Sequence, residues 1–270
     1  MTSLVEIERR DHLAILWMID SARRNALSVA LVTQLIDALR STKADGARGV
    51  VIASREKAFC AGADIRDMLE NGWLDAGPGT VAHVTPPDLF QAIENEARPV
   101  VAAVDGLALG GGVELCLACD LVFAAASASF MFPELGLGVL PNTALARLPE
   151  LIGARAAAGL ILTRRRIDAA EAARLGLVNI AVEAPSAVEE AVATCRNIID
   201  NTPPVAFAAA KRTLRGGRDW GGIRSILAEI DPTEWREGTS AFLEKRRPEY
   251  EQFWNRAVGT QHRGPSSIEE

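Results

Sequence analysis

Two glutamates stand in otherwise apolar segments of the sequence. Glu114 follows three consecutive glycines and opens a helical pattern of aliphatic residues, and Glu134 lies in the middle of residues 130–136, F-M-F-P-E-L-G. The chain between them has room for a helix, a strand and a turn that return to the same edge of a sheet. Two carboxylates that meet in an apolar pocket have raised and separated pKa values, as acid/base chemistry at neutral pH requires. The alternative is that both are ordinary residues, Glu114 facing solvent in a first helical turn and Glu134 at the surface or capping a helix.

Two runs of small residues follow predicted strands and could bring a ligand close to the backbone. Residues 59–65 read F-C-A-G-A-D-I after a strand at 50–53, and residues 110–112 are G-G-G after a strand at 99–104. Free N–H groups at a helix start can donate to an anion or a carbonyl. A tight turn without a ligand would give a similar pattern at 59–65. The triple glycine is not G-x-G-x-x-G, so a dinucleotide-binding fold is not favoured.

The elements that must position these residues alternate between strand and helix. Strand patterns at 5–8, 13–19, 49–53, 99–104 and 121–124 accompany a helical pattern at 28–39. After residue 154 helices dominate, at 154–162, 169–175, 187–199 and 205–214, with one further strand at 177–182. The fold class is therefore α/β with a helical C-terminal part. Residues 71–87 have turn residues and no clear period, so they predict a loop or lid.

Composition and charge exclude several classes of protein. The chain has 270 residues, 49% hydrophobic and 24% charged, which is typical of a globular protein. Its net charge is -6 and its pI about 5.3, so no positive field attracts nucleic acid or an anionic membrane. The first residues match neither a signal peptide nor a transit peptide, and no apolar run approaches the ~20 residues that span a bilayer. We expect a cytoplasmic protein without nucleic-acid or membrane partners.

Four cysteines raise the question of a redox or metal site. Cys116 and Cys119 form a C-x-x-C, a pattern found in redox and zinc sites. They lie, however, within an apolar helical pattern, and the three histidines are scattered along the chain. We expect reduced, buried packing cysteines and no metal.

Several segments together resemble the signature blocks of the crotonase (enoyl-CoA hydratase/isomerase) family. They are K-A-F-C-A-G-A-D-I at 57–65, R-P-V-V-A-A-V-D-G-L-A-L-G-G-G-V-E-L at 98–115, F-M-F-P-E-L-G-L-G at 130–138 and R-I-D-A-A-E-A-A-R-L-G-L-V-N at 166–179, with weaker matches N-A-L at 25–27 and A-F-L-E-K-R at 241–246. The resemblance implies a spiral of β-β-α repeats with a helical C-terminal region that forms trimers, often paired into hexamers. We expect a spiral core over 1–200, a helical region over 201–258 and a disordered tail over 259–270.

The resemblance also implies site residues. The backbone N–H groups of Ala63 and Gly111 match the family's oxyanion hole, which binds the thioester oxygen. Positions that match substrate or CoA contacts are Ala61, Asp64, Ile65, Pro133 and Asn142, and two that would reach the CoA of a neighbouring subunit, Phe242 and Lys245.

Glu114 and Glu134 match both carboxylates of the family's hydratases. The implied reaction is syn addition of water to a trans-2-enoyl-CoA, in which Glu114 deprotonates the water and Glu134 protonates the α carbon, or the two roles are exchanged or shared. Coenzyme A is part of the substrate, so no further cofactor is implied. The alternatives are double-bond isomerisation or C–C bond hydrolysis in the same oxyanion hole, or a non-catalytic acyl-CoA-binding protein.

The resemblance fails at residues 141–148. The family usually has P-G-x-G-G-T-Q-R-L there, whereas this chain reads P-N-T-A-L-A-R-L without the glycines. Asn tolerates a left-handed backbone better than most residues, so we expect Asn142 to keep the glycine conformation while its side chain narrows the pocket. This departure predicts an acyl preference different from that of a short-chain hydratase.

Overall fold

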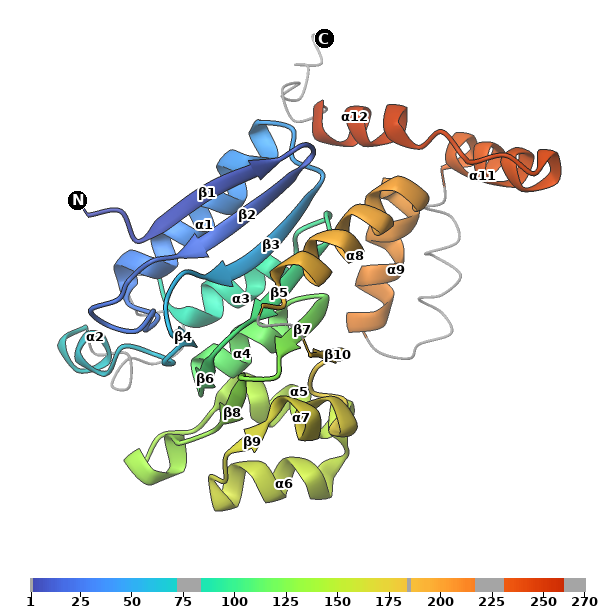
Figure 1. Cartoon of the computed structure of the whole chain (residues 1–270). Helices are drawn as coiled ribbons and strands as arrows, with labels where there is room; N and C mark the ends of the chain where they lie inside the picture. Colours follow the sequence, from blue (N-terminus) through green and yellow to red (C-terminus); the bar gives the residue numbers. More distant parts are fainter. Residues whose placement is uncertain (1, 72–83, 184–185, 217–230, 260–270) are drawn as a thin grey trace, which may run out of the picture.

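The strands form two sheets, and from the third strand of the chain to the eighth they belong alternately to one sheet and the other (Figure 1). The structure is a computed structural model and describes residues 2–71, 84–183, 186–216 and 231–259. The larger sheet has the order β1 (Val5–Arg10), β2 (Leu13–Met18), β3 (Gly49–Ser54), β5 (Val100–Val104), β7 (Leu121–Ala125), β10 (Ile180–Val182). The smaller sheet has the order β4 (Ala58–Cys60), β6 (Leu107–Leu109), β8 (Ser129–Met131), β9 (Ile167–Asp168).

Each repeat gives one strand to each sheet and then continues into a helix. The repeats are β3 and β4 followed by α2 (Ile65–Glu70) and α3 (Pro86–Glu94), β5 and β6 followed by α4 (Gly111–Ala118), and β7 and β8 followed by the 3-10 turn η1 (Glu134–Leu137) and α5 (Asn142–Ile152). The pairs β3–β5, β5–β7, β4–β6 and β6–β8 are all parallel. The predicted spiral of β-β-α repeats is therefore confirmed.

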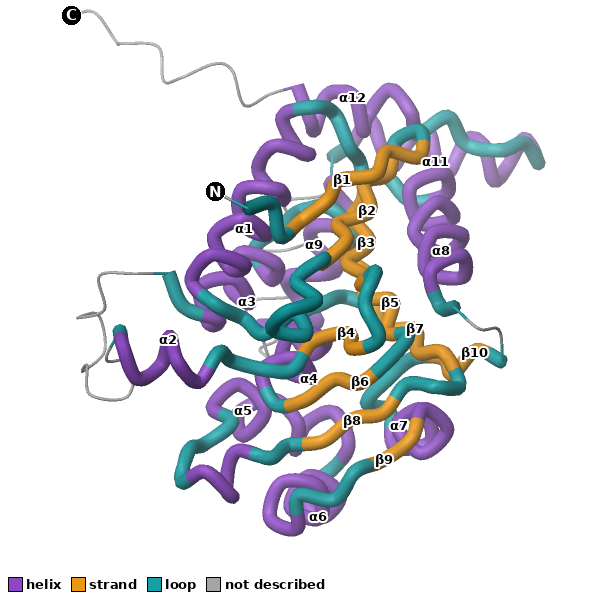
Figure 2. The backbone as a smooth tube through the Cα atoms, turned by 60° about the vertical axis from the view of Figure 1, so that its left-hand side comes forward, coloured by secondary structure: helices purple, strands orange, loops and turns teal. Residues whose placement is uncertain are grey.

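The larger sheet is covered on both faces, which explains its uncharged strands. Alternate residues of β3 point to opposite sides: Val50 and Ile52 pack with α1 (Val29–Ala44), α3 and α4, while Val51 and Ala53 pack with α8 (Val188–Asn201). Figure 2 shows α1 and α3 on one side of the strands and α8 on the other. A parallel strand that is buried on both faces has a continuous apolar sequence rather than an alternating one.

Local signals set the ends of several helices. Ser28 caps α1, and Asp168 and Gly176 bound α7 (Ala169–Leu175) as the sequence predicts. The predicted loop at 71–87 ends too late, because Thr85 and Asp88 form a capping box and α3 starts at Pro86. Residues 72–83 of that loop lie outside the described residues, as does the predicted tail beyond Gly259.

The C-terminal part is mainly helical, as predicted, and its strands are β10, within the predicted strand at 177–182, and the two-residue β9. α6 (Ala154–Thr163), α8 and α9 (Pro204–Gly216) precede α11 (Pro232–Glu244) and α12 (Glu251–Gly259). α12 returns to the core and buries Trp254, whereas α11 extends away from the sheets with Phe242 82% exposed (Figure 1). All four cysteines are free and buried, and burial raises the pKa of the Cys60 thiol to about 12. Among the described residues no helix is long and apolar enough to cross a membrane.

We expect the turn between β5 and β6 to tolerate no side chain at Gly106. A methyl group at this position would lie 2.0 Å from the Lys57 carbonyl oxygen, so Gly106→Ala must push apart the turns that precede the paired strands β4 and β6. Overpacking of this kind predicts a loss of about 2–3 kcal/mol in the free energy of unfolding, measured by urea titration. Gly159→Ala on α6 is the matched control, because nothing lies within 4 Å of its added methyl group. Equal stability of the two variants would contradict the prediction.

Candidate active site

Three loops meet at the carboxyl edge of the smaller sheet. β4, β6 and β8 run parallel and lie side by side (Figure 2), with Leu107 opposite both Ala58 and Ser129 and Leu109 opposite Met131. Because parallel strands end at the same edge, the segments that follow them are neighbours. These segments are residues 61–64, residues 110–114 and residues 132–134. Both candidate glutamates and both candidate N–H donors lie in them.

The Ala63 and Gly111 N–H groups lie next to each other. Leu27 forms a parallel bridge with Ala63 in which Leu27 bonds to the Gly62 carbonyl and the Asp64 N–H, so the Ala63 N–H points away from Leu27. Gly111 is the first residue of α4, where an N–H has no acceptor within the helix. A methyl group on Gly111 would lie 3.1 Å from the Ala63 nitrogen. Within the described part of the chain neither N–H has an acceptor.

Asn25 holds the segment that orients Ala63, a role not predicted from the sequence. It is fully buried, its Oδ1 accepts the Asp20 N–H at 2.8 Å, and its Nδ2 donates to Ser54 Oγ at 2.7 Å and to the Phe59 carbonyl at 3.2 Å. These bonds tie the chain before Leu27 to β3 and β4. The signal in the sequence is the match N-A-L at 25–27. A fully buried asparagine is unusual, so its burial here calls for a role of this kind.

Glu114 is held by the start of another helix. α4 is buried on all sides, and Glu114 is 9% exposed. Its Oε1 accepts the Ala144 N–H of α5 at 3.0 Å. Burial raises the pKa of Glu114, and the backbone N–H groups of Ala144 and Thr143 oppose that rise by bonding to the ionised form.

Glu134 lies against Gly110 and has a less satisfied carboxyl group. A methyl group on Gly110 would lie 2.2 Å from Glu134 Oε1 and would displace that carboxyl group, and the φ of 47° at Gly110 favours glycine there. Glu134 Oε2 is buried without a hydrogen-bond partner in the described structure. Burial raises the pKa of Glu134 to about 7, with a further contribution from the negative charge of Glu114.

This arrangement can move protons beside a developing negative charge. Glu114 has amide donors that favour its ionised form, while burial and the charge of Glu114 raise the pKa of Glu134, so that Glu134 keeps its proton to a higher pH than an ordinary carboxyl group does. The Ala63 and Gly111 N–H groups can together donate to one oxygen that gains charge. The structure thus brings together the four central residues of the sequence prediction.

The predicted CoA-contacting residues divide into two groups. Ala61, Asp64 and Ile65 flank Ala63 at the start of α2, and Pro133 precedes Glu134 at the start of η1. Asp64 is buried because it caps α2 through the Arg66 and Asp67 N–H groups, and Ile65 is 54% exposed.

Phe242 and Lys245 are not brought to this edge of the sheet. Phe242 lies on α11 and Lys245 directly follows it, and that helix projects away from the small sheet in Figure 1. Whether they reach the site of another copy stays a prediction.

The expectation for Asn142 is wrong in its backbone. Asn142 is the first residue of α5 and is not among the residues with positive φ, so it does not take a left-handed conformation. Its side chain is exposed. The reason is that residues 142–144 form the first turn of a helix whose N–H groups face Glu114. A helical turn does not require glycine.

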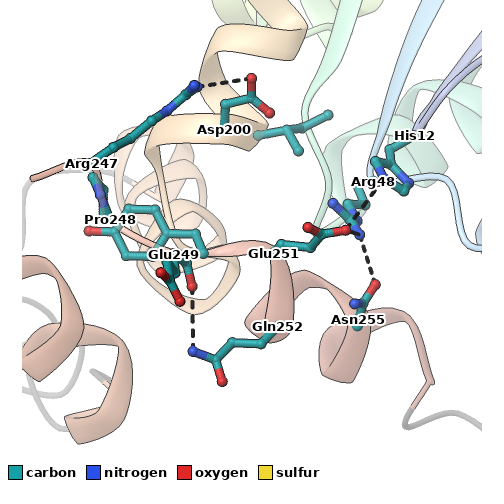
Figure 3. A pocket seen from close by; sticks show the side chains of 11 residues that line it. His12, Arg48, Asp200, Arg247, Pro248, Glu249, Glu251, Gln252 and Asn255 are labelled. Atoms are coloured by element: carbon teal, nitrogen blue, oxygen red, sulfur yellow. Dashed lines mark hydrogen bonds and ion pairs between the residues drawn. The ribbon is translucent and has the colours of Figure 1, made fainter.

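A polar pocket of about 600 Å³ lies elsewhere, beside α12 and the end of α8 (Figure 3). None of the candidate site residues lines it. Its charged groups are paired with their neighbours: Arg48 Nη2 lies 2.8 Å from Asn255 and 3.2 Å from Glu251, and Arg247 lies 3.1 Å from Asp200. We therefore assign the chemistry to the sheet edge and not to this polar pocket.

The raised pKa of Glu134 predicts a pH-dependent cost in stability. A carboxyl group with a folded pKa of about 7, above its ordinary 4.5, favours folding below pH 4.5 and loses that contribution as the pH rises through 7. Glu134→Gln should therefore gain stability relative to wild type between pH 5 and pH 8, measured by urea unfolding at both values. Glu150→Gln, an exposed position on α5, is the control. If the difference in the free energy of unfolding between Glu134→Gln and wild type is the same at both pH values, the raised pKa of Glu134 is refuted.

The chain matches known proteins over most of its length. The family model described as enoyl-CoA hydratase/isomerase matches residues 8–255. A probable enoyl-CoA hydratase of Rhizobium meliloti is 38% identical over 236 residues, covering 84% of this chain and 89% of the relative. The 2,3-dehydroadipyl-CoA hydratase of Escherichia coli is 33% identical over 259 residues, covering 93% and 99%. The crystal structure of an enoyl-CoA hydratase from Bacillus anthracis has a TM-score of 0.80 at 30% identity and covers 92% of this chain and 99% of its own. Together with the spiral of β-β-α repeats, these matches show that the chain belongs to the enoyl-CoA hydratase/isomerase family.

Proposed function

We propose that the protein is an enoyl-CoA hydratase that adds water across the double bond of a trans-2-enoyl-CoA. The observation that carries this proposal is the meeting of two carboxyl groups of raised pKa with two backbone N–H groups that have no acceptor among the described residues. The names of the relatives support the reaction. The acyl group is left to experiment, because one relative is named for a dicarboxylic substrate, 2,3-dehydroadipyl-CoA.

The proposed mechanism assigns one task to each group. The thioester oxygen accepts hydrogen bonds from the N–H groups of Ala63 and Gly111, which stabilise the negative charge of the enolate. Each such donor lowers the activation barrier by about 3–4 kcal/mol. Glu114, whose ionised form accepts amide hydrogen bonds, removes a proton from water while the water oxygen bonds to the β carbon. Glu134 in its protonated form gives its proton to the α carbon. Glu114 then holds the proton from water and Glu134 is ionised, and exchange with solvent restores both groups without any cofactor.

Turnover of a defined panel tests this function. We expect the protein to consume enoyl thioester absorbance and to give products one water heavier, with enoyl-CoAs that differ in length, branching and terminal carboxylate. A product of unchanged mass would indicate isomerisation, and a cleaved acyl chain would indicate C–C bond hydrolysis. Binding of the whole panel without turnover would indicate a non-catalytic acyl-CoA-binding protein. Any of these three outcomes replaces the hydratase proposal.

Glu114→Gln and Glu134→Gln should each lower kcat by about 100-fold or more, because each removes a proton-transferring group. Binding of the CoA thioester, measured by calorimetry, should change little. Glu150→Gln serves as the control for loss of a carboxylate outside the site. A variant that keeps more than about a third of wild-type kcat on the best substrate would show that its residue does not transfer the proton.

We further propose that the chain assembles as a homotrimer or homohexamer. Large apolar side chains are exposed on α9 and α11, with exposed fractions of 86% for Leu214, 60% for Trp235, 82% for Phe242 and 78% for Leu243. Large apolar residues that are this exposed on two C-terminal helices are typical of subunit interfaces. In such an assembly Phe242 and Lys245 could contact the CoA of a neighbouring copy.

The assembly predicts a mass of three or six times the 28.9 kDa of one chain. Light scattering at micromolar concentration measures it directly. Phe242→Asp should weaken the assembly by placing a charge in the apolar interface, whereas Lys57→Asp, a change far from α11 in the sequence and on the loop before β4, should leave it intact. A wild-type monomer would contradict the proposal.

A further inference from the structure

A series of charged side chains connects α5 to the far end of α4. Arg147 Nη2 on α5 lies 2.6 Å from Glu94 Oε1 at the end of α3. The same Glu94 oxygen lies 3.4 Å from Arg215 Nη1 on α9. Arg215 Nη2 in turn donates to the Ala118 carbonyl at 2.6 Å and to Asp120 Oδ1 at 3.1 Å. Since Ala118 ends the helix that carries Glu114, the connection returns to the candidate catalytic helix.

The α4 end of this series is fixed in the core. Asp120 Oδ2 accepts the Val100 N–H of β5 at 2.8 Å and lies 2.8 Å from Lys211 Nζ. Lys211 is 5% exposed and also donates to the Ile93 carbonyl at 3.2 Å. A buried charge with several partners is costly to displace. Through Arg215, the Glu94–Arg147 pair therefore joins α5 to a rigid point.

The start of α5 has weak local support and depends on distant contacts. Pro141 at its N-cap makes no side-chain cap, its first turn has no acidic residue, and Pro149 interrupts its hydrogen bonds. Its first-turn N–H groups face Glu114, which also has Glu134 of η1 as its ionisable neighbour. Arg147 follows Ala144 by one helical turn, so the residue that anchors α5 lies close to the residue that bonds Glu114.

We propose that the Glu94–Arg147 ion pair positions Glu114 by fixing the N-terminus of α5 against its carboxylate. The pair is half-buried, with side-chain exposures of 31% for Arg147 and 21% for Glu94, so water screens it less than a fully exposed pair. Arg147 and Glu94 are positioning residues that act through Ala144. The consequence for turnover rests on the proposed function, whereas the effect on the Glu114 carboxyl group does not.

Steady-state kinetics of three variants tests the consequence for turnover. Arg147→Ala and Glu94→Gln should each lower kcat about tenfold, a loss expected when a reacting group is displaced by a fraction of an ångström, with KM changed less than about twofold. Without its amide donors Glu114 binds its proton more tightly, so the low-pH limb of kcat should move to higher pH. Arg147→Lys should restore most of kcat because it restores the pair.

Arg165→Ala is the matched control. Arg165 pairs with Glu171 at 2.7 Å, but this exposed pair links the loop before β9 to α7 and touches neither α4 nor α5. It should leave kcat and its pH profile unchanged. Thermal unfolding of all variants separates positioning from loss of fold, since the kinetic measurements are made where each variant is fully folded.

Infrared titration of the Glu114 carboxyl group gives a second readout that is independent of turnover. The band is assigned by its loss in Glu114→Gln, and its midpoint should rise in Arg147→Ala and return in Arg147→Lys. If the wild-type protein hydrates no enoyl-CoA but the midpoint rises, the proposed function fails and the positioning role stands. An unchanged midpoint in folded Arg147→Ala overturns the positioning role, whatever the activity.

Discussion

The parallel pairing of three short strands is the constraint on which the site depends. β4, β6 and β8 have three residues each, so their ladders contribute few hydrogen bonds and close backbone contacts must hold them in register. Gly106 lies against the Lys57 carbonyl, and a methyl group on Gly112 would lie 2.5 Å from the Cys60 carbonyl oxygen. The second contact brings α4 directly onto the end of β4. As a result the Gly111 N–H lies beside the Ala63 N–H. Glycine at positions 106 and 112 is therefore explained by packing as much as by chemistry.

Within that frame two carboxyl groups of the same kind acquire different properties. Both are desolvated, which raises the pKa of each. Glu114 receives N–H groups from α5, which favour its ionised form, whereas Glu134 has one buried oxygen without a partner in the described structure and feels the charge of Glu114. Environment and not residue type therefore separates the two carboxyl groups, in the direction that the proposed base and acid roles require. The unsatisfied oxygen of Glu134 is a cost to stability that a purely structural residue would not carry.

The sequence predicted the long elements and the identity of the central residues better than their surroundings. The continuous apolar runs at 49–53 and 99–104 correspond to β3 and β5 within a residue at each end, since strands buried on both faces have an unmistakable composition. β4, β6 and β8 are too short to show a period, so the second sheet was expected only from the family resemblance. The contact of Glu114 with Ala144 joins segments far apart in the chain, and no local pattern predicts it, whereas the N-A-L match at 25–27 points to Asn25 without giving its partners. The expectation for Asn142 is wrong for a similar reason, because the helical turn that Asn142 begins donates the N–H groups of Thr143 and Ala144 to Glu114, a contact between distant segments.

The start of α5 shows how a tertiary contact can replace a local helix signal. An isolated helix with proline at its N-cap and no acidic first turn leaves its first N–H groups to water. Here Glu114 supplies the missing negative charge from another helix. The start of α9 is stabilised similarly, because Glu234 of α11 accepts hydrogen bonds from the Val205 and Ala206 N–H groups. The stabilisation is mutual, since the helix start also lowers the cost of burying the carboxylate. The formation of α5 and the ionisation of Glu114 therefore favour each other, because the hydrogen bond between the Ala144 N–H and the Glu114 carboxylate contributes to both.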